Sequence, residues 1–313
     1  QLVPALGLGP WALGLLMKPA ALVLTASRSR VTDLLVLTKA RVNALVVATT
    51  AGGYYLGASG AIDVLSLVVT CLGTTLVASG AAAINQVDER DTDRLMVRTR
   101  QRPVAEGRMG SNEGRAVAVG LSIAGLLILW LGANVAAMVV ALATLLSYAF
   151  VYTPLKRRTS LSTVVGAVPG ALPPLIGWAA SRGTVAELAP WSLFLLMFLW
   201  QLPHFLAIAW LYREDYARAG LPMLSVIDRD GVLTGRQATL WAATLVPFSV
   251  LPYLVGMAGP AYGAGAILLG MVQLGLAINF AVRRTNASAR TLFYGSITYL
   301  PLLWLLMVID KNY

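Results

Sequence analysis

The stretch LSLVVTCLGTTLVASGAAAI at residues 65–84 carries no charged side chain. A helix rises about 1.5 Å per residue, so a stretch of this length spans the roughly 30 Å hydrocarbon core of a bilayer. Comparable apolar windows recur along the chain near residues 34–58, 64–84, 115–131, 135–152, 162–180, 190–211, 237–256, 262–282 and 290–309. A β-barrel would show short alternating segments instead. The sequence therefore predicts an all-α polytopic membrane protein with nine transmembrane helices.

The composition and the placement of charge support this prediction. Hydrophobic residues make up 58% of the 313 residues and charged residues only 12%, whereas soluble domains carry roughly 25% charged residues. When the 24 Lys and Arg are sorted by the side on which nine spans place them, 22 fall on one side, and only Arg182 and Lys311 fall on the other. The positive-inside rule then places the N-terminus and the charged loops in the cytoplasm. The net charge of +10 thus reflects topology and an anionic ligand, and no nucleic-acid partner is expected.

The chain divides into a short N-terminal segment and one large domain. Residues 1–27 are apolar but are interrupted by prolines and glycines, with Lys18 in the middle. A tenth span there would move the following arginines to the wrong side of the membrane. We therefore expect a cytoplasmic or interfacial segment over 1–33 and a nine-helix transmembrane domain over 34–310.

Charged clusters alternate in sign at the cytoplasmic ends of the predicted spans. Acidic residues lie at 88–93, basic residues at 156–158, acidic residues again at 214–215 and basic residues at 283–284. This order indicates two four-helix halves followed by one additional helix. It also predicts a polar chamber in which carboxylates and cations face one another.

The first acidic cluster has the spacing of a helix face. In NQVDERDTDRLMVRTRQRPVAEGR at 85–108, Asn85, Glu89 and Asp93 follow at intervals of four, so they share one face if the helix continues. Mg²⁺ takes oxygen ligands and commonly binds through one or two carboxylates plus substrate phosphates. One interpretation is a metal site, and the other is a solvated loop whose charges form salt bridges.

The basic triplet and the single histidine are further candidates. In YTPLKRRT at 152–159, Lys156 and Arg157 are suited to stabilise a diphosphate leaving group, although a headgroup anchor is an alternative. His204 lies in WQLPHFLAIAW, inside a predicted span. A buried imidazole in a membrane is a functional candidate, and the alternative is a hydrogen bond to a carbonyl freed by Pro203 or to a neighbouring helix. If the helix continues, His204 and Asp215 project from one face.

These motifs resemble a known family. The pattern N-x-x-x-E-x-x-x-D at 85–93, followed by MVRTRQRPVAEGR, is similar to the first Asp-rich motif of UbiA-type intramembrane prenyltransferases, in the form found in the branch that farnesylates protoheme IX. YTPLKRRTSLSTVVGAVPGALPPLIGW at 152–178 and FLWQLPHFLAIAWLYREDYARAGLPML at 198–224 are similar to that branch over long runs. The resemblance covers roughly residues 34–310.

The resemblance implies a nine-helix fold in which Mg²⁺-bound farnesyl diphosphate reacts with a vinyl group of haem B. It assigns metal binding to Asn85, Glu89, Asp93 and Asp215. The residues expected to bind the diphosphate are Lys156, Arg157, Arg98, Arg102, Lys39 and Arg41. His204 and Tyr212 are expected to contact the haem, with His204 either as an iron ligand or as a base toward the quenching water.

The chain departs from the general family pattern, and alternatives stay open. Gln86 and Glu89 occupy two carboxylate positions of the first motif, and Tyr212 and Tyr216 occupy two of the second. One alternative is a prenyltransferase acting on an aromatic quinone precursor. Another is a haem or anion transporter, a class that favours polar groups near the bilayer midplane.

The expected partners are farnesyl diphosphate, haem B and membrane lipid. Self-association and association with a haem A synthase are left open. The expected location is the bacterial cell (inner) membrane.

Overall fold

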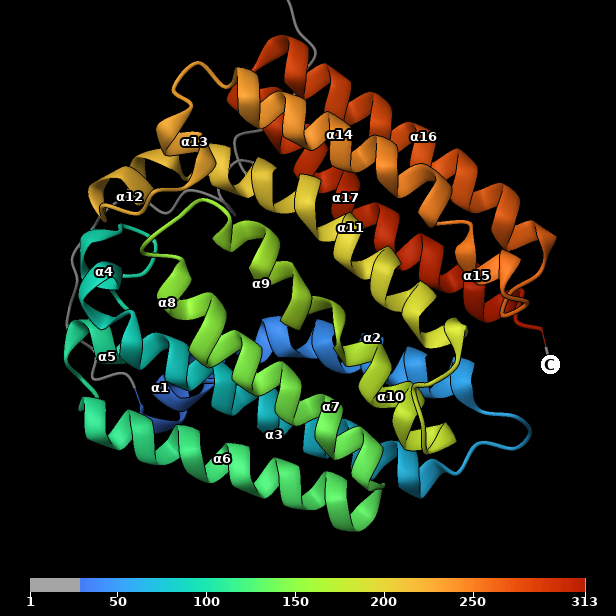
Figure 1. The fold of residues 1–313 in the computed structure, drawn as a ribbon. Coiled ribbons are helices and arrows are strands. Elements are labelled where there is room, and N and C mark those ends of the chain that lie inside the picture. The colour runs from blue at the N-terminus through green and yellow to red at the C-terminus, as the bar shows by residue number, and fades with distance from the viewer. Residues whose placement is uncertain (1–28, 313) are drawn as a thin grey trace, which may run out of the picture.

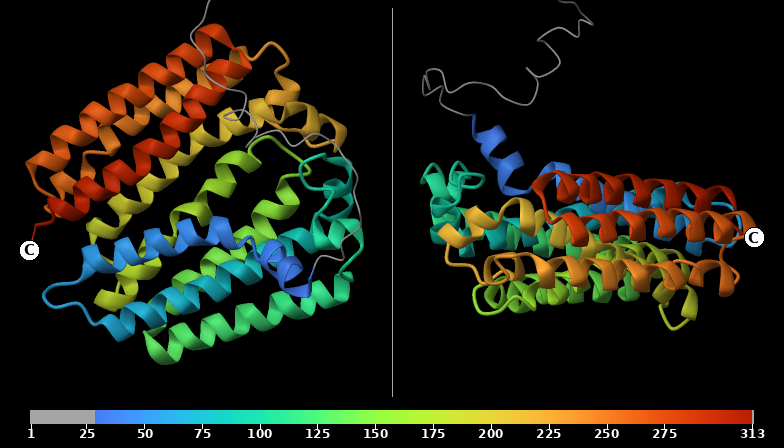
Figure 2. Two further views of the ribbon diagram at one scale, coloured as in Figure 1. Left: turned by 180° about the vertical axis from the view of Figure 1, so that it is seen from behind. Right: turned by 90° about the horizontal axis from the view of Figure 1, so that it is seen from above.

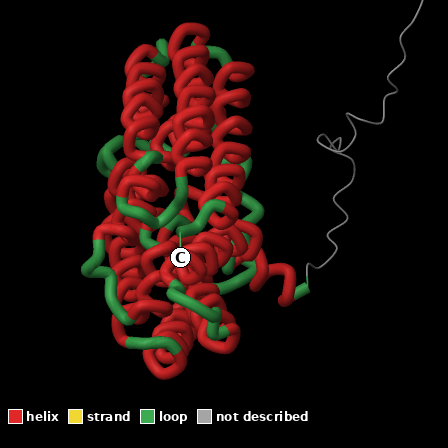
Figure 3. The backbone as a smooth tube through the Cα atoms, turned by 90° about the vertical axis from the view of Figure 1, so that its right-hand side faces the viewer, coloured by secondary structure: helices red, strands yellow, loops and turns green. Residues whose placement is uncertain are grey.

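The computed structural model describes residues 29–312, so most of the predicted segment 1–33 lies outside the described residues. The described chain is helical almost throughout, with a single isolated β-bridge between Ala258 and Lys311 (Figure 1 and Figure 3). The elements in chain order are α1 Arg30–Leu37, α2 Ala40–Gly57, α3 Val64–Asp88, α4 Arg90–Leu95, α5 Pro103–Glu106, α6 Ser111–Gly132, α7 Val135–Leu146, the π-helix η1 Ser147–Tyr152, α8 Thr153–Leu155, α9 Ser162–Ala171, α10 Pro173–Arg182, α11 Leu188–Leu211, α12 Arg213–Arg218, α13 Leu224–Ile227, α14 Val232–Phe248, α15 Leu251–Leu254, α16 Pro260–Arg283 and α17 Asn286–Ile309.

Seven helices within residues 29–312 are long and apolar enough to cross a membrane. They are Val64–Asp88, Ser111–Gly132, Val135–Leu155, Ser162–Arg182, Leu188–Leu211, Pro260–Arg283 and Asn286–Ile309. The bent pair α1 and α2 makes an eighth candidate, with an angle of 49° at its break. The chain is an all-α integral membrane protein, as predicted from its apolar windows.

The predicted span at 237–256 differs from the other eight. In its place α14 has 17 residues and contains Pro247, and a turn at Ser249 separates it from the short helix α15, which has Pro252 in its first turn. Proline lacks the amide hydrogen that a continuing helix needs, so the two prolines explain the interruption. A ninth span across this break stays a prediction.

The helices pack into two groups that face each other (Figure 1). One group contains α2, α3, α6, α7 and α10, with a buried core that includes Tyr54, Leu129 and Ile176. The other contains α11, α14, α16 and α17, with Leu206 and Phe280 in its core. Figure 2 shows the long helices running side by side, while α4, α5, α12 and α13 gather at one end. The acidic motif lies at that end, and the C-terminus lies at the other.

Two glycines allow α2 and α10 to pack backbone against backbone. A Cβ atom on Gly177 would overlap the carbonyl oxygen of Thr50, and one on Gly53 would overlap the carbonyl of Pro174. Membrane helices that lack a hydrophobic driving force between them rely on small residues for such close contact. The contact fixes α2, whose N-terminal end borders the acidic motif.

We predict that Gly177→Ala destabilises the protein by about 1–3 kcal/mol, because the added methyl group would force the two backbones apart. The midpoint of thermal unfolding in detergent should fall. Gly120→Ala in α6 is the matched control, since an added Cβ there meets no atom within 4 Å. Alanine is the better helix former, so the control should be neutral or stabilising. Equal midpoints for the two variants would contradict the role given to this contact.

Candidate active site

The acidic motif lies where α3 passes into α4. The helix is interrupted at Glu89, but the amide of Glu89 donates to the carbonyl of Asn85 at 2.9 Å and the amide of Asp93 donates to that of Glu89 at 2.8 Å. The three residues therefore still follow one another at one-turn intervals. Their exposed fractions are 2%, 3% and 0% for Asn85, Glu89 and Asp93. Such burial excludes the solvated loop that the sequence left open.

The two buried acids of the motif, Glu89 and Asp93, each bind a cation from another part of the chain. Lys156, directly after α8, donates from Nζ to both carboxylate oxygens of Glu89 at 2.9 and 3.0 Å. Arg102 donates from Nη1 to Oδ2 of Asp93 at 2.7 Å. The structure thus brings the predicted acidic and basic groups together in one buried cluster.

Asn85 accepts a hydrogen bond from a third cation, Lys39, which lies in the turn between α1 and α2. Its Nζ is 2.9 Å from Oδ1 of Asn85 and 3.4 Å from the hydroxyl of Tyr148. The amide nitrogen of Asn85 donates to Oγ1 of Thr153 at 3.4 Å. Lys39 has φ +49°, a left-handed conformation that residues other than glycine rarely adopt. This backbone turn points its side chain into the cluster.

Gln86 stabilises the turn at Lys39. Its Nε2 donates to the carbonyls of Val36 and Leu37 at 2.7 and 2.9 Å, at the end of α1. An ionised carboxylate has no hydrogen to donate, so the acid found here in the general family pattern could not make these bonds. The departure at Gln86 therefore has a structural reason, and it serves the placement of Lys39.

The electrostatics of the two carboxylates differ. Burial alone would raise the pKa of Glu89, but the charge and hydrogen bonds of Lys156, followed by the charges of Lys39 and Arg102, hold that pKa below its ordinary value. Burial raises the pKa of Asp93, although Arg102 opposes the rise. Glu89 is therefore the more firmly ionised of the two.

One oxygen of the cluster has no hydrogen-bond partner among the described residues. Oδ1 of Asp93 is buried and unbonded, while Oδ2 is bound by Arg102. A buried carboxylate oxygen without a partner is costly, and it fits a hard cation as ligand. Within residues 29–312, no three His, Cys, Asp or Glu side chains are grouped closely enough to hold a metal ion alone. A Mg²⁺ ion here would need further ligands, such as Asn85 and the oxygens of a bound phosphate.

Asp215 lies beside the cluster and not inside it. It belongs to α12, and its carboxylate accepts hydrogen bonds from the amides of Val97 and Arg98 at 3.3 and 3.4 Å and from the side chain of Arg218. These bonds attach α12 to the segment that follows α4. Asp215 therefore lies against the segment that follows α4, and its hydrogen bonds are to that segment and to Arg218.

The remaining predicted cations lie around the cluster. Arg157 is exposed and donates to the carbonyl of Asp88. The guanidinium of Arg98 lies 5.0 Å from the ring centre of Tyr212, so these two predicted site residues contact each other. Arg41 is exposed at the start of α2. Lys39, Arg102 and Lys156 are the inner cations, which bind the oxygen-bearing side chains. The outer cations are Arg41, Arg98 and Arg157.

His204 lies away from this cluster, between α11 and α17. Its Nδ1 is 2.7 Å from Oγ of Ser296. Its ring stacks on Trp200 and Phe293, with centroid distances of 5.1 and 5.0 Å. The hydrogen bond to a neighbouring helix is the alternative that the sequence offered. The shared face of His204 and Asp215 required a helix that continues to Asp215. In the structure α11 ends at Leu211, and Tyr212 separates it from α12.

The sequence did not identify Tyr148 and Thr153 as site residues. Tyr148 belongs to η1, a π-helical turn, and Thr153 follows it in α8. Such turns are frequent at functional sites because they redirect side chains within a helix. Pro154 signals a disturbed helix here, but neither its presence nor the apolar pattern predicts the π-helical geometry.

The chain matches curated proteins over most of its length. Residues 45–306 match the model of the UbiA prenyltransferase family. A protoheme IX farnesyltransferase of Solibacter usitatus is 46% identical over 288 residues, which cover 89% of this chain and 98% of the relative. A protoheme IX farnesyltransferase of Koribacter versatilis is 40% identical over 305 residues, covering 94% of this chain and 98% of the relative.

Solved structures share the fold at low identity. A structure from work on digeranylgeranylglyceryl phosphate synthase has a TM-score of 0.75 at 18% identity, covering 90% of this chain and 98% of that one. A UbiA homologue from Archaeoglobus fulgidus bound to GPP and Mg²⁺ has a TM-score of 0.61 at 14% identity, covering 88% and 99%. Together with the match over residues 45–306, these findings show that the chain belongs to the UbiA prenyltransferase family.

Proposed function

We propose that this protein transfers a farnesyl group from farnesyl diphosphate to a vinyl group of protoheme IX, giving haem O. One observation carries the site assignment: a buried row of oxygen ligands at one end of the helices is lined by cations from three other segments. The members of this cluster are Asn85, Glu89, Asp93, Lys39, Arg102 and Lys156. The choice of acceptor is supported by the curated relatives, which carry the name protoheme IX farnesyltransferase.

The oxygen row is the proposed site for a Mg²⁺-bound diphosphate. Asn85, Glu89 and Asp93 would hold the metal, and the unbonded Oδ1 of Asp93 supports this assignment. Asp215 is proposed to complete the site from α12. When bound, Mg²⁺ supplies positive charge to the oxygens of the leaving group. This chain has fewer carboxylates than the general family pattern. Its own cations would therefore supply more of the positive charge that the leaving group needs.

The cations are proposed to stabilise the departing diphosphate. As the bond between C1 and the diphosphate oxygen breaks, the electron pair stays with the diphosphate, and negative charge grows there. Lys156 and Arg102 lie close enough to the acids to move from them to phosphate oxygens, with Lys39 beside them. Arg157, Arg98 and Arg41 are proposed to bind the diphosphate from the rim.

The rest of the reaction needs an apolar enclosure and water in the last step. The π electrons of the vinyl group attack the allylic cation and form the new carbon–carbon bond. Water then adds to the cation beside the porphyrin ring and loses a proton, which gives the hydroxyl group. The apolar helices exclude water from the allylic cation before the vinyl group reaches it. His204 and Tyr212 are proposed to contact the haem.

The charges support an enzyme over a transporter, since the charged cluster lies at the helix ends. We place the protein in the bacterial inner membrane, with this end in the cytoplasm, because the positive-inside rule favours it. Residues 34–310 are proposed as the catalytic domain.

We predict that Glu89→Gln and Asp93→Asn each reduce turnover by roughly a hundredfold or more, because a charged ligand of the metal is lost. The assay supplies haem B, farnesyl diphosphate and Mg²⁺ to the protein in membranes and measures the product by mass. Asp91→Asn is the matched control, since this acid of the same motif has a side chain that is 76% exposed. Near-normal turnover in both cluster variants would contradict the site.

Lys156→Gln should lower kcat/KM for farnesyl diphosphate by about tenfold or more, because a charge-assisted hydrogen bond to the leaving group is lost. Haem binding, followed by absorption spectroscopy, should change little. Arg158→Gln, an exposed neighbour in the same triplet, is the control. If Lys156→Gln weakens haem binding and leaves kcat/KM for farnesyl diphosphate unchanged, this cation serves the haem propionates and not the diphosphate.

His204→Ala should weaken haem binding while farnesyl diphosphate still binds. Nδ1 of His204 is hydrogen-bonded to Ser296. Nε2 is therefore the atom that would bind haem iron or contact the quenching water. A changed haem absorption band indicates iron ligation, and a farnesylated product without the hydroxyl group indicates a base. Ser296→Ala, which keeps the imidazole, should have a smaller effect. Full activity with an unchanged spectrum would leave His204 with a packing role only.

A further inference from the structure

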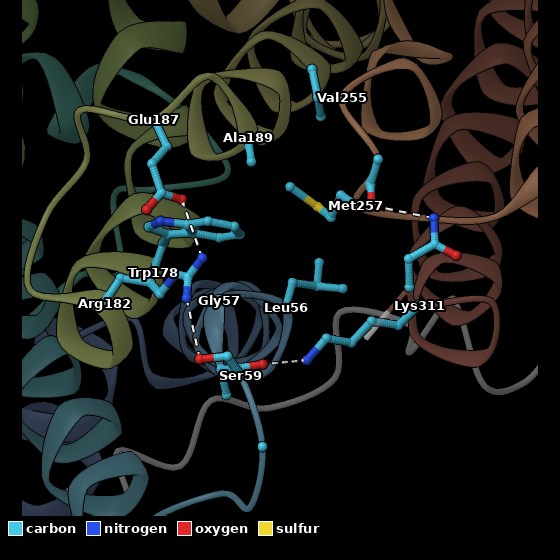
Figure 4. A pocket seen from close by; sticks show the side chains of 14 residues that line it. Leu56, Gly57, Ser59, Trp178, Arg182, Glu187, Ala189, Val255, Met257 and Lys311 are labelled. Carbon is cyan, nitrogen blue, oxygen red and sulfur yellow. Dashed lines mark hydrogen bonds and ion pairs between the residues drawn. The ribbon is translucent and has the colours of Figure 1, made fainter.

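A cavity of about 320 Å³ lies at the end of the molecule opposite to the acidic motif. Figure 4 shows its lining residues. Residues from the C-terminal ends of α2 and α10, the start of α11, the turn after α15 and the last described residues line it. The 18 residues of α2, at about 1.5 Å per residue, put roughly 27 Å between this cavity and Lys39. A group bound here is therefore separate from the proposed diphosphate site.

The cavity is lined by two cations, Arg182 and Lys311, that lie at the opposite end of the molecule from the other Lys and Arg among the described residues. Among residues 29–312, Arg182 and Lys311 are the two Lys or Arg at this end, and every other one lies at the end of the acidic motif. Both line the cavity, although they come from segments that are far apart in the sequence. Topology disfavours cations at this end, so their convergence indicates a local task.

Arg182 is held at one side of the cavity. Its Nη1 donates to Oγ of Ser59 at 3.2 Å, and its guanidinium lies 5.9 Å from the ring centre of the buried Trp178. Its Nη2 is 3.6 Å from a carboxylate oxygen of Glu187, longer than a good hydrogen bond. Glu187 is the one acid among the described lining residues.

Lys311 is held at another side of the cavity by the end of α2. Its Nζ donates to the carbonyls of Tyr55 and Ala58, both at 2.7 Å, and lies 4.6 Å from the ring centre of Tyr55. Burial lowers the pKa of Lys311, and the charge of Arg182 lowers that pKa further. The two cations therefore repel each other across the cavity, and an anion between them would relieve this repulsion.

The remaining walls suit an amphipathic ligand. Leu56, Val255 and Met257 present apolar side chains toward the space that the two cations border (Figure 4). The cavity also lies at the helix ends, which is the level of the lipid headgroups for helices of this length. Basic pockets between helices bind anionic headgroups on the cytoplasmic side of membranes, and the two cations offer the same chemistry at this end.

We propose that this cavity binds a phosphate group, presented by the headgroup of an anionic phospholipid in the leaflet away from the acidic motif. Guanidinium and ammonium groups bind phosphate through charge-assisted hydrogen bonds. Free phosphate offers the same chemistry and is the other source of the ligand. Glu187 competes for Arg182, so removing its charge strengthens the binding.

The test uses the full chain in nanodiscs of phosphatidylglycerol mixed with phosphatidylcholine. Native mass spectrometry measures which lipid stays bound after release from the disc. Phosphatidylglycerol should be retained in preference, and Arg182→Gln and Lys311→Gln should each reduce its retention by about tenfold. Glu187→Gln should increase retention, a gain that misfolding cannot produce. Arg290→Gln, an exposed cation at the other end, should match the unchanged protein.

A second arm separates the two sources of phosphate. Inorganic phosphate is added to the detergent-purified protein, and its stabilisation is read from the thermal unfolding midpoint. If phosphate stabilises the protein with the same dependence on Arg182 and Glu187 while the two lipids are retained equally, the ligand is free phosphate. The proposal is overturned if Arg182→Gln, Lys311→Gln and Glu187→Gln all behave like Arg290→Gln in both arms.

Discussion

The buried ion pair between Glu89 and Lys156 is the interaction on which the candidate site depends. It joins the end of α3 to the residue after α8, with Nζ bound to both carboxylate oxygens. Removing two charges from water costs several kcal/mol per ion, which good mutual geometry can offset. Asp93 with Arg102 repeats the arrangement one turn later. A chain with so few charged residues can concentrate them here because each acid has its own cation.

The same dependence extends to the first two helices. Gln86 fixes the last carbonyls of α1, and the chain then turns at Lys39 through a left-handed residue. Without that turn, α1 and α2 would run as one rod, and the ammonium group would not reach Asn85. The amide of Gln86, in place of a carboxylate, thus stabilises the turn that brings the charge of Lys39 into the cluster.

The sequence predicted the fold and the composition of the cluster because both follow from strong, local signals. Apolar windows of about 20 residues specify spans, and the spacing of Asn85, Glu89 and Asp93 specifies a shared face. The pairing of each acid with a particular cation could not be predicted, since it depends on the turns at Lys39 and η1. The contact of His204 with Ser296 depends on how α11 and α17 pack, which periodicity does not encode. Pro247 and Pro252 accompany the interruption of the predicted span at 237–256, whereas the apolar pattern around them favours one continuous helix.

The glycine contact between α2 and α10 has a consequence for how the protein is made. Gly53 lies against Pro174 and Gly177 against Thr50 in the finished structure, yet more than a hundred residues separate the two glycines in the chain. At roughly 5–20 residues per second, α2 leaves the ribosome on the order of ten seconds before its partner does. During that interval its glycine face has only lipid, α1 or the helices between α2 and α10 to meet. The protein must therefore hold an early helix in the bilayer in an unfinished state, and the order of synthesis sets how long that state lasts.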